Sequence, residues 1–278
     1  MKQHLILFIL FFSISTAQAQ FSVRLFAGAS NYQGDLQQKK FTFDQAHFGF
    51  GLGAGYQFTP HLSARAMATF GKVSADDKNS NSNKERNLNF TSKINEFQLV
   101  GEYTFKDMDV SKLSPYLFAG VAVYSFNPYT KDSTGEKFYL QPLSTEGQGF
   151  FEDRKTYKLT QISIPFGAGL KLAFTDRLTM GVEFGFRKTF TDYLDDVSTT
   201  YIDQNLLMQN RGAKAVELAF RGGELKTGTT YPAGGSQRGS TKKDWYYFTG
   251  ITAQINLGTG GGSRNGKGVG CPSLKSVF

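Results

Sequence analysis

Residues 161–190 read QISIPFGAGLKLAFTDRLTMGVEFGFRKTF and contain the pattern that decides the fold. On both sides of Thr175-Asp176-Arg177, apolar residues alternate with small, polar or charged ones. Such alternation is typical of a β-strand with two unlike faces. Each run is longer than the roughly 5–6 residues of a usual soluble strand. Both match the roughly 9–11 tilted residues with which a strand crosses a bilayer.

Eight segments of this kind occur along the chain, and the joins between them alternate in length. The segments are residues 21–32, 48–58, 62–73, 93–105, 115–127, 159–174, 178–190 and 245–257. The short joins are 59–61, 106–114 and 175–177, and the long, polar joins are 33–47, 74–92, 128–158 and 191–244. A soluble sandwich would not place its long connections so regularly. The pattern predicts an all-β protein, a transmembrane antiparallel up-and-down β-barrel of about eight strands with short periplasmic turns and long outer loops.

The first residues predict export. A short basic start, an apolar run over residues 5–14 and the sequence Ala17-Gln18-Ala19 indicate a signal peptide, residues 1–19. The residue directly after the expected cleavage point is Gln20 and not a cysteine, which argues against a lipid anchor. The formal charge is +8, but export makes nucleic acid an improbable partner. We therefore expect a barrel over residues 20–257 in the outer membrane, with membrane lipids or proteins as its partners.

Two further segments stand apart from the strands. In the join 191–244, a short helix is expected within residues 202–220, with Asp203 as its N-cap and Gly212 interrupting it. Residues 258–278 begin with a glycine-rich linker and predict a flexible periplasmic tail. That tail carries Arg264, Lys267 and Cys271. An unpaired cysteine in an oxidising compartment is either an inert thiol or a contact with a partner, so these residues are candidates for a protein contact.

Charged residues on the strand faces opposite the apolar ones predict a lumen held by ion pairs. They are Arg24, Arg65, Glu96, Glu102, Lys171, Glu183 and Arg187. Eight strands leave an interior that side chains can fill, which favours a plugged barrel over a conducting pore. Aromatic residues at strand ends are expected to form interfacial girdles. They are Phe58, Phe105, Tyr116, Phe174, Phe190, Trp245, Tyr246 and Tyr247.

The sequence offers little for catalysis or for a metal. Small barrels that hydrolyse lipids need a serine with a histidine base near the outer rim. His61 falls in a periplasmic turn, and His47 has no evident serine partner, although it could meet Asp192. Asp192, Asp195 and Asp196 could hold Ca²⁺ loosely, but they lack the usual spacing. We expect no enzyme activity, no cofactor, no metal and no small-molecule substrate, and a turn and cap role for these carboxylates with Arg154 or Lys188 as partners.

Several stretches together resemble a known family. They are AGASNYQGDL at 27–36, RNLNF at 86–90, PYLFAG at 115–120, Asn127-Pro128, LQPLSTEGQG at 140–149, IPFG at 164–167 and RKTFTDYLDDVSTTY at 187–201. With these stretches the chain resembles the PorG family of Bacteroidetes outer-membrane proteins. The two longest stretches are the most specific, and they contain Glu146, Asp192, Tyr193, Asp195 and Asp196 as motif residues at the outer rim.

The resemblance implies a role in protein export. Members of that family are associated with the type IX secretion system and, in gliding species, with motility. The resemblance implies a barrel that helps to anchor the periplasmic ring of that system through a PorK-like lipoprotein and PorN-like subunits. A generic small barrel of the OmpA type, with a structural or adhesive role, is the alternative. A pore or a lipid-modifying enzyme is a more distant one.

Overall fold

The computed structural model describes residues 20–37, 39, 42–79, 83–225 and 228–257. The expected signal peptide, residues 1–19, lies outside the described residues. The expected tail, residues 258–278, with Arg264, Lys267 and Cys271, lies outside them as well.

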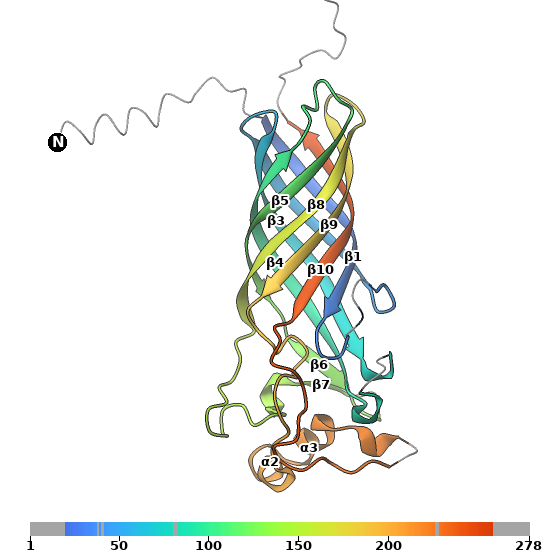
Figure 1. Ribbon diagram of the computed structural model, residues 1–278, viewed down its shortest axis with the longest axis vertical. Coiled ribbons are helices and arrows are strands. Elements are labelled where there is room, and N and C mark those ends of the chain that lie inside the picture. The colour runs from blue at the N-terminus through green and yellow to red at the C-terminus, as the bar shows by residue number, and fades with distance from the viewer. Residues whose placement is uncertain (1–19, 38, 40–41, 80–82, 226–227, 258–278) are drawn as a thin grey trace, which may run out of the picture.

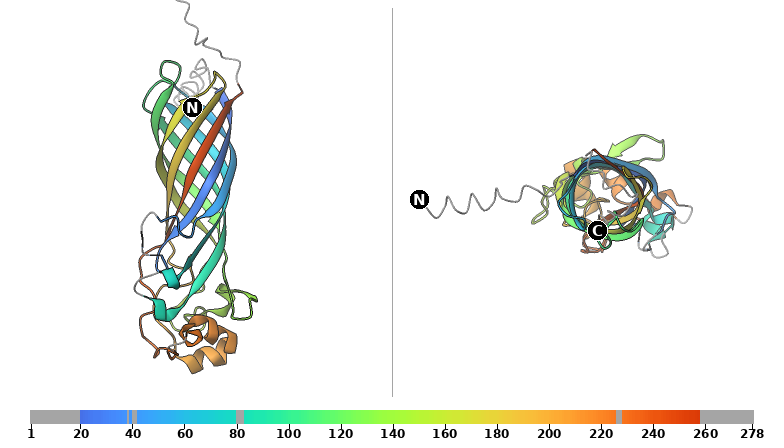
Figure 2. Two further views of the ribbon diagram at one scale, coloured as in Figure 1. Left: turned by 90° about the vertical axis from the view of Figure 1, so that its right-hand side faces the viewer. Right: turned by 90° about the horizontal axis from the view of Figure 1, so that it is seen from above.

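Eight long antiparallel strands close into a barrel (Figure 1). They are β1 (Gln20–Gln33), β2 (His47–Gln57), β3 (Leu62–Asp76), β4 (Asn89–Thr104), β5 (Leu113–Ser125), β8 (Thr160–Ala173), β9 (Leu178–Thr189) and β10 (Trp245–Asn256). Each pairs with its neighbour in the chain, β1 pairs with β10, and β3 pairs with β4. Viewed along its axis, the barrel is a ring (Figure 2). The predicted transmembrane up-and-down barrel of eight strands is confirmed.

Strand ends differ from the prediction where the barrel extends beyond its apolar belt. Strands β3 and β4 stay paired as far as Asp76 and Asn89, where polar side chains hide the alternation. A short hairpin of β6 (Pro128–Lys131) and β7 (Lys137–Tyr139) was not predicted. It pairs with β4 through Thr91 and Tyr129. Strands of four and three residues are too short to give a periodic signal.

The two faces of the wall differ sharply in exposure. Outward side chains such as Phe48 and Phe97 are 71% and 60% exposed, whereas Glu96 and Gln98, which flank Phe97, are each 2% exposed. Apolar residues facing outward are stable where lipid replaces water. Among the described residues, no helix is long and apolar enough to cross a membrane.

The predicted aromatic girdles are wrong at three positions. Phe58, Phe105, Phe174 and Phe190 are about half exposed or more, at the ends of strands, as expected for an interface. In contrast, Tyr116, Tyr246 and Tyr247 are buried. These three tyrosines are buried because each phenol forms a hydrogen bond inside the protein, to Glu183, Glu96 and the Thr42 carbonyl respectively.

The barrel has two unlike ends, which we call the turn end and the loop end. β1 begins and β10 finishes at the turn end, where the joins β2–β3, β4–β5 and β8–β9 also lie (Figure 1). At the loop end the long joins pack into a folded cap, formed by the described residues within 34–46, 77–88, 126–159 and 190–244. Its helices are η1 (Asp77–Asn79), η2 (Lys84–Arg86), η3 (Gln141–Leu143), α2 (Gln204–Arg211), α3 (Ala213–Ala219) and η4 (Gly222–Glu224).

The two α-helices occupy the segment in which a helix was expected. Asp203 caps α2, since its carboxylate accepts hydrogen bonds from the backbone of Asn205 and Leu206. Gly212 separates α2 from α3 with φ of +82°, a value that favours glycine. One hydrophobic core runs from the barrel interior, at Phe26 and Phe248, into the cap, at Leu194 and Leu218. The cap is therefore continuous with the filling of the barrel.

Candidate functional site

The barrel interior near the turn end is organised around one carboxylate, Glu102. Its side chain is fully buried and lies 2.7 Å from the Lys171 ammonium, 3.2 Å from Arg65 and 3.3 Å from Arg24. Ser63 donates a further hydrogen bond of 3.1 Å. Three cations converge on one anion because β3 is paired directly with β4, while the inward positions of β1 and β8 lie within reach of β4 in a narrow lumen.

A second carboxylate, Glu183, shares Arg65 with Glu102. Arg65 donates two hydrogen bonds of 2.6 and 2.9 Å to Glu183, in the forked geometry that suits a guanidinium and a carboxylate. The Tyr116 hydroxyl donates another of 2.7 Å to Glu183. The guanidinium carbon of Arg65 also lies 4.7 Å from the centre of the Phe118 ring. The two carboxylates are thus joined into one network.

The third carboxylate lies farther toward the loop end. Glu96 accepts hydrogen bonds of 3.1–3.2 Å from Arg187 and one of 2.7 Å from the Tyr246 hydroxyl. Arg187 also packs on the Phe248 ring, at 4.7 Å. All seven charged residues assigned to the lumen are buried, and each lies in an ion pair. Charges that are buried and paired in this way fill the lumen, and the removal of one partner would leave the other uncompensated.

In the cap, the two longest motifs contact each other directly. Glu146, from LQPLSTEGQG, accepts hydrogen bonds from the backbone of Ser198 and Thr199 and from the Thr199 hydroxyl, at 2.8–3.2 Å. Arg238 forms an ion pair of 3.0 Å with it. Tyr193 donates at 3.3 Å. Glu146 is fully buried, so these donors replace the water that its charge would otherwise bind.

Asp196 makes the second connection between these motifs. Its carboxylate accepts hydrogen bonds from the Thr145 hydroxyl, at 2.5 Å, and from the Tyr157 hydroxyl, at 2.7 Å. Asp196 has φ of +67°, a left-handed conformation that aspartate tolerates at a turn. Burial raises the pKa of Asp196 to about 6, although Arg238 and the two hydroxyls oppose the shift.

A buried phenol bridges two further carboxylates. The Tyr32 hydroxyl lies 2.6 Å from Oδ2 of Asp195 and 3.0 Å from Oδ1 of Asp244. A phenol has one hydrogen, so it donates to one carboxylate only, and a proton on the other completes the second bond. Burial raises the pKa of both aspartates well above the usual value, and neighbouring carboxylates raise it further. Gly34 is required beside this bridge, because a Cβ atom there would collide with Tyr32 and Asp244.

Two more aspartates of the cap have no cation in an ion pair with them among the described residues. Asp192 accepts a 2.7 Å hydrogen bond from Ser198, and its Oδ1 has no hydrogen-bond partner within the same part of the chain. Burial raises the pKa of Asp192 to about 7. Asp35 accepts hydrogen bonds from the backbone and the hydroxyl of Ser240, at 2.8 and 2.7 Å, and burial raises its pKa too. Hydroxyls and backbone N–H groups therefore take the place of cations around these carboxylates.

The expected partners of the rim aspartates are wrong. Arg154 donates to the backbone carbonyls of Glu146 and Thr200 and to the Thr200 hydroxyl instead, and no described contact joins Lys188 to the aspartates. Asp192, Asp195 and Asp196 are at most 2% exposed, so they are not part of a solvated loop. Their partners come from distant loops, which spacing along the chain cannot reveal.

Other motif residues reach the same cap. Arg86, from RNLNF, forms a forked ion pair of 2.7 Å with Asp77 and donates to the Arg238 carbonyl. Asn87 donates to the Arg221 carbonyl at 3.0 Å. Tyr32 and Asp35 belong to AGASNYQGDL. Sequence reasoning quoted these stretches as motifs but missed their roles, together with those of Arg238 and Asp244. The shared signal is polar residues close to the loop end of a strand, either just before it or just after it.

The histidines and the metal ligands considered above do not assemble into a site within the described part of the chain. Nε2 of His47 lies 2.7 Å from the Ser74 hydroxyl, and no described contact joins it to Asp192. Nδ1 of His61 lies 2.8 Å from the Thr104 carbonyl oxygen at the turn end. No group of three or more metal-ligating side chains with metal-binding geometry occurs among the residues that the structure describes.

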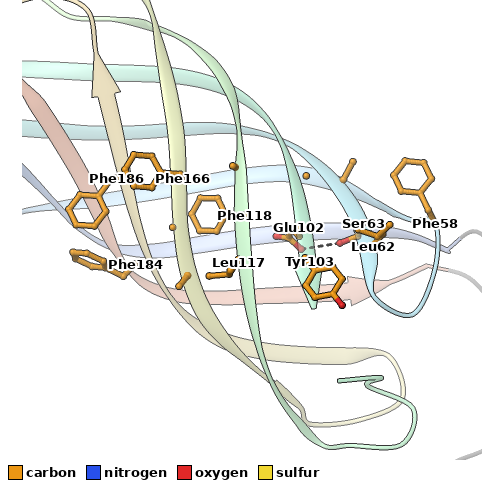
Figure 3. Close-up of a pocket in the computed structure, with 15 residues that line it drawn as sticks. Phe58, Leu62, Ser63, Glu102, Tyr103, Leu117, Phe118, Phe166, Phe184 and Phe186 are labelled. Atoms are coloured by element: carbon orange, nitrogen blue, oxygen red, sulfur yellow. Dashed lines mark hydrogen bonds between the residues drawn. The ribbon is translucent and has the colours of Figure 1, made fainter. Parts of the chain in front are cut away.

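The outer wall carries a sizeable apolar groove, of about 830 Å³, shown in Figure 3. It crosses β3, β4, β5, β8 and β9, and starts near the turn end, at Phe58. Its lining includes alanine and glycine residues together with larger side chains such as Leu62, Tyr103 and Leu117. This mostly apolar lining accommodates hydrocarbon, and its polar members Ser63 and Glu102 are buried and hydrogen-bonded to each other.

Comparison with protein families places this chain in one of them. Residues 2–210 match the model of a family described as Domain of unknown function (DUF6089). The match covers most of the chain, and the chain belongs to this family. The search of curated proteins finds no match.

Solved structures with a similar fold are outer-membrane or surface proteins. Neisserial surface protein A is 11% identical, with a TM-score of 0.44, and the match covers 86% of this chain and 99% of that one. A major outer membrane protein from Thermus thermophilus is 14% identical, with a TM-score of 0.42 and coverage of 86% and 100%. The outer membrane protein OprG from Pseudomonas aeruginosa is 10% identical, with a TM-score of 0.37 and coverage of 85% and 94%.

Proposed function

We propose that the chain is a non-enzymatic outer-membrane protein that resembles PorG and anchors the periplasmic ring of the type IX secretion system. One observation carries the scaffold part of this proposal: the buried ion-pair network of the lumen. Glu102 alone binds three cations there, at 2.7–3.3 Å. A barrel filled in this way supports an attached assembly better than it transports a solute.

The secretion part of the proposal rests on the motifs. LQPLSTEGQG and RKTFTDYLDDVSTTY, which suggested the resemblance, come together at Glu146 and Asp196 in the cap. The two motifs that carry the resemblance thus form one folded unit. The ring partners would be a PorK-like lipoprotein and PorN-like subunits, and in gliding bacteria the same attachment would serve motility.

The attachment itself would lie at the turn end. Both ends of the barrel sheet are there, at Gln20 and Asn256, so residues 258–278 follow from that side. We assign the partner contact to this tail, with Arg264 and Lys267 as charged contacts and Cys271 as a thiol for a close or covalent one.

Affinity purification of the full chain from native outer membranes, followed by identification of its partners, tests the proposal. The expected result is recovery of the ring lipoprotein, and loss of that protein when residues 258–278 are deleted while the barrel still inserts. The control is the loop variant Glu136→Gln, whose altered side chain is exposed in the cap and which should still recover the ring lipoprotein. Recovery of no ring protein with the full chain would overturn the secretion role.

A second candidate is a structural or adhesive barrel of the OmpA type. The observation that favours it is the folded cap, which projects beyond the barrel with α2 and α3 at its tip (Figure 1). In that case deletion of the gene would alter surface attachment and leave protein export normal. A lipid-modifying enzyme would instead show altered lipid species that a His47 substitution abolishes.

A further inference from the structure

A row of lysines lies on the outside of the barrel, between its apolar belt and the loop end. Lys72 of β3 and Lys93 of β4 are directly opposite each other in the antiparallel register. Lys93 is on the same face of β4 as Phe97, whose ring is 60% exposed, so its side chain points away from the lumen. Two like charges in this position repel each other and weaken the pairing of the strands.

The β6–β7 hairpin extends this lysine row. Tyr129 is opposite Thr91 of β4, and Thr91 shares its face with Lys93. Within the hairpin, Tyr129 is opposite Tyr139 and Lys131 is opposite Lys137. Directly opposed residues share a face, so the hairpin adds two lysines and two tyrosines to it. We call the set Lys72, Lys93, Tyr129, Lys131, Lys137 and Tyr139 the basic rim patch.

The hairpin residues of the patch form a compact unit. The Lys137 ammonium lies 3.9 Å from the centre of the Tyr129 ring and 4.3 Å from that of Tyr139, and it donates to the Tyr139 hydroxyl at 2.9 Å. Lys137 and Lys93 both lower the pKa of Tyr139, the hydrogen bond from Lys137 being the larger cause. The opposite face of the hairpin, at Thr130 and Asp132, is buried against the cap. The basic face is therefore fixed outward.

The patch also lacks the counter-charges found elsewhere at the loop end. In the cap, Arg86 pairs with Asp77, Arg221 with Glu224 and Lys214 with Asp132. Among the described residues, none of the four patch lysines has a carboxylate within 4.0 Å. The carboxylates nearest in sequence are Asp132, Glu136 and Asp76. Among the described ion pairs, Asp132 joins Lys214, and neither Glu136 nor Asp76 joins a lysine of the patch.

We propose that the basic rim patch binds the anionic phosphate groups of lipid headgroups in the leaflet at the loop end. The short distance between the patch and the lipid-facing side chains favours a lipid as the bound molecule. Phe70, 39% exposed, is two residues from Lys72, and Phe97 is four residues from Lys93. At roughly 3.3 Å per residue, the lysines stand about 7–13 Å from lipid-facing rings. That is where lysine side chains reach headgroup phosphates and where tyrosines prefer to lie.

Native mass spectrometry of the full chain in a neutral detergent tests this, with phosphatidylglycerol and phosphatidylcholine as the added lipids. The wild-type protein is expected to retain phosphatidylglycerol in preference to phosphatidylcholine. The double variant Lys93→Gln/Lys137→Gln should bind phosphatidylglycerol about tenfold more weakly, since each lysine near a phosphate strengthens binding several-fold. The matched control is Lys106→Gln/Lys112→Gln, which removes the same charge from the turn end and should bind like the wild type.

Three results would overturn the proposal. One is equal retention of the two lipids by the wild-type protein. Another is an equal loss of phosphatidylglycerol in the rim variant and the turn-end control, which would mean that only net charge matters. The third is displacement of bound phosphatidylglycerol by an equal concentration of inorganic phosphate. That result would mean that the patch recognises a free anion and not a lipid. Before the comparison, the folding of each variant is checked by electrophoresis, in which a folded barrel changes its mobility when the sample is heated.

Discussion

The lumen and the cap both bury charged side chains, but they balance these charges differently. In the lumen, four cations and three carboxylates are all held in ion pairs. In the cap, Asp35, Asp192, Asp195 and Asp244 accept hydrogen bonds from hydroxyls and backbone N–H groups, with no cation in an ion pair with any of them among the described residues. Loss of one lumen charge leaves its partners unpaired, whereas loss of one of these cap charges relieves repulsion. The same chemical change should therefore have opposite effects in the two regions.

The largest effect is expected from Glu102→Gln in the lumen. Lys171 and Arg24 would lose the carboxylate that they bind at 2.7 and 3.3 Å, and both cations would stay buried. Leaving buried cations unpaired should lower the free energy of unfolding by about 3–5 kcal/mol. Urea unfolding of the barrel in lipid vesicles measures this change. The control Glu136→Gln removes the same charge from an exposed position of the hairpin, so an equal shift in both variants would contradict the account.

Acidification should stabilise the cap, by less than the loss of stability expected from Glu102→Gln. The pKa is about 7 for Asp192 and about 6 for Asp196, against about 3.8 for aspartate in the unfolded chain. The folded cap therefore binds more protons than the unfolded one between pH 4 and pH 7, and its stability falls as the pH rises through the folded values. We expect a gain of about 2 kcal/mol between pH 8 and pH 5, discounted for solvent screening.

Hydrogen exchange of cap amides measures that gain, with the amides of β4 and β5 as an internal reference. Protection of the cap that rises toward high pH, after correction for intrinsic exchange, would contradict the proposed protonation. A variant with Asp192→Asn should lose part of the pH dependence, because one of the titrating aspartates of the cap is then absent.

Asp244→Asn should have the smallest effect, and of opposite sign to Glu102→Gln. The amide group can accept from the Leu194 N–H and donate to the Tyr32 hydroxyl, which leaves that hydroxyl free to donate to Asp195. The variant thus reproduces the protonated carboxyl, and at pH 8 it should stabilise the cap on the order of 1 kcal/mol. The difference should shrink as the pH falls and the wild-type carboxyl takes up its proton. Limited proteolysis of the cap at both pH values tests this, and easier cleavage of the variant at pH 8 would refute the shared proton.

How much the sequence predicted also differs between the regions. Alternation along 161–190 is sufficient for the barrel strands, because a lipid-facing wall requires an apolar side chain at every second residue. The inward charges follow from the same period. The cap has no period: its contacts, such as Tyr32 with Asp244 or Arg86 with the Arg238 carbonyl, join residues that are 212 and 152 positions apart. The three aspartates of RKTFTDYLDDVSTTY could therefore be noticed but not placed.

The limits of the period are visible in the tyrosines as well. Tyr116 and Tyr246 were expected at the interface because they fall near strand ends, yet their rings point inward and their hydroxyls bind Glu183 and Glu96. A tyrosine is tolerated on either face, since its ring suits lipid and its hydroxyl suits a buried carboxylate. Phenylalanine lacks the hydroxyl, and Phe58, Phe105, Phe174 and Phe190 are all on the exposed side.

Conductance of the purified full chain in planar lipid bilayers tests most directly the claim that the barrel is a filled scaffold. The account predicts no current above the background of the bare bilayer, both before and after proteolytic removal of the cap. The second result is decisive, because Arg65, Glu102 and Glu183 fill the lumen below the cap and do not depend on it. Discrete current steps from the intact protein, or from the barrel without its cap, would contradict the account.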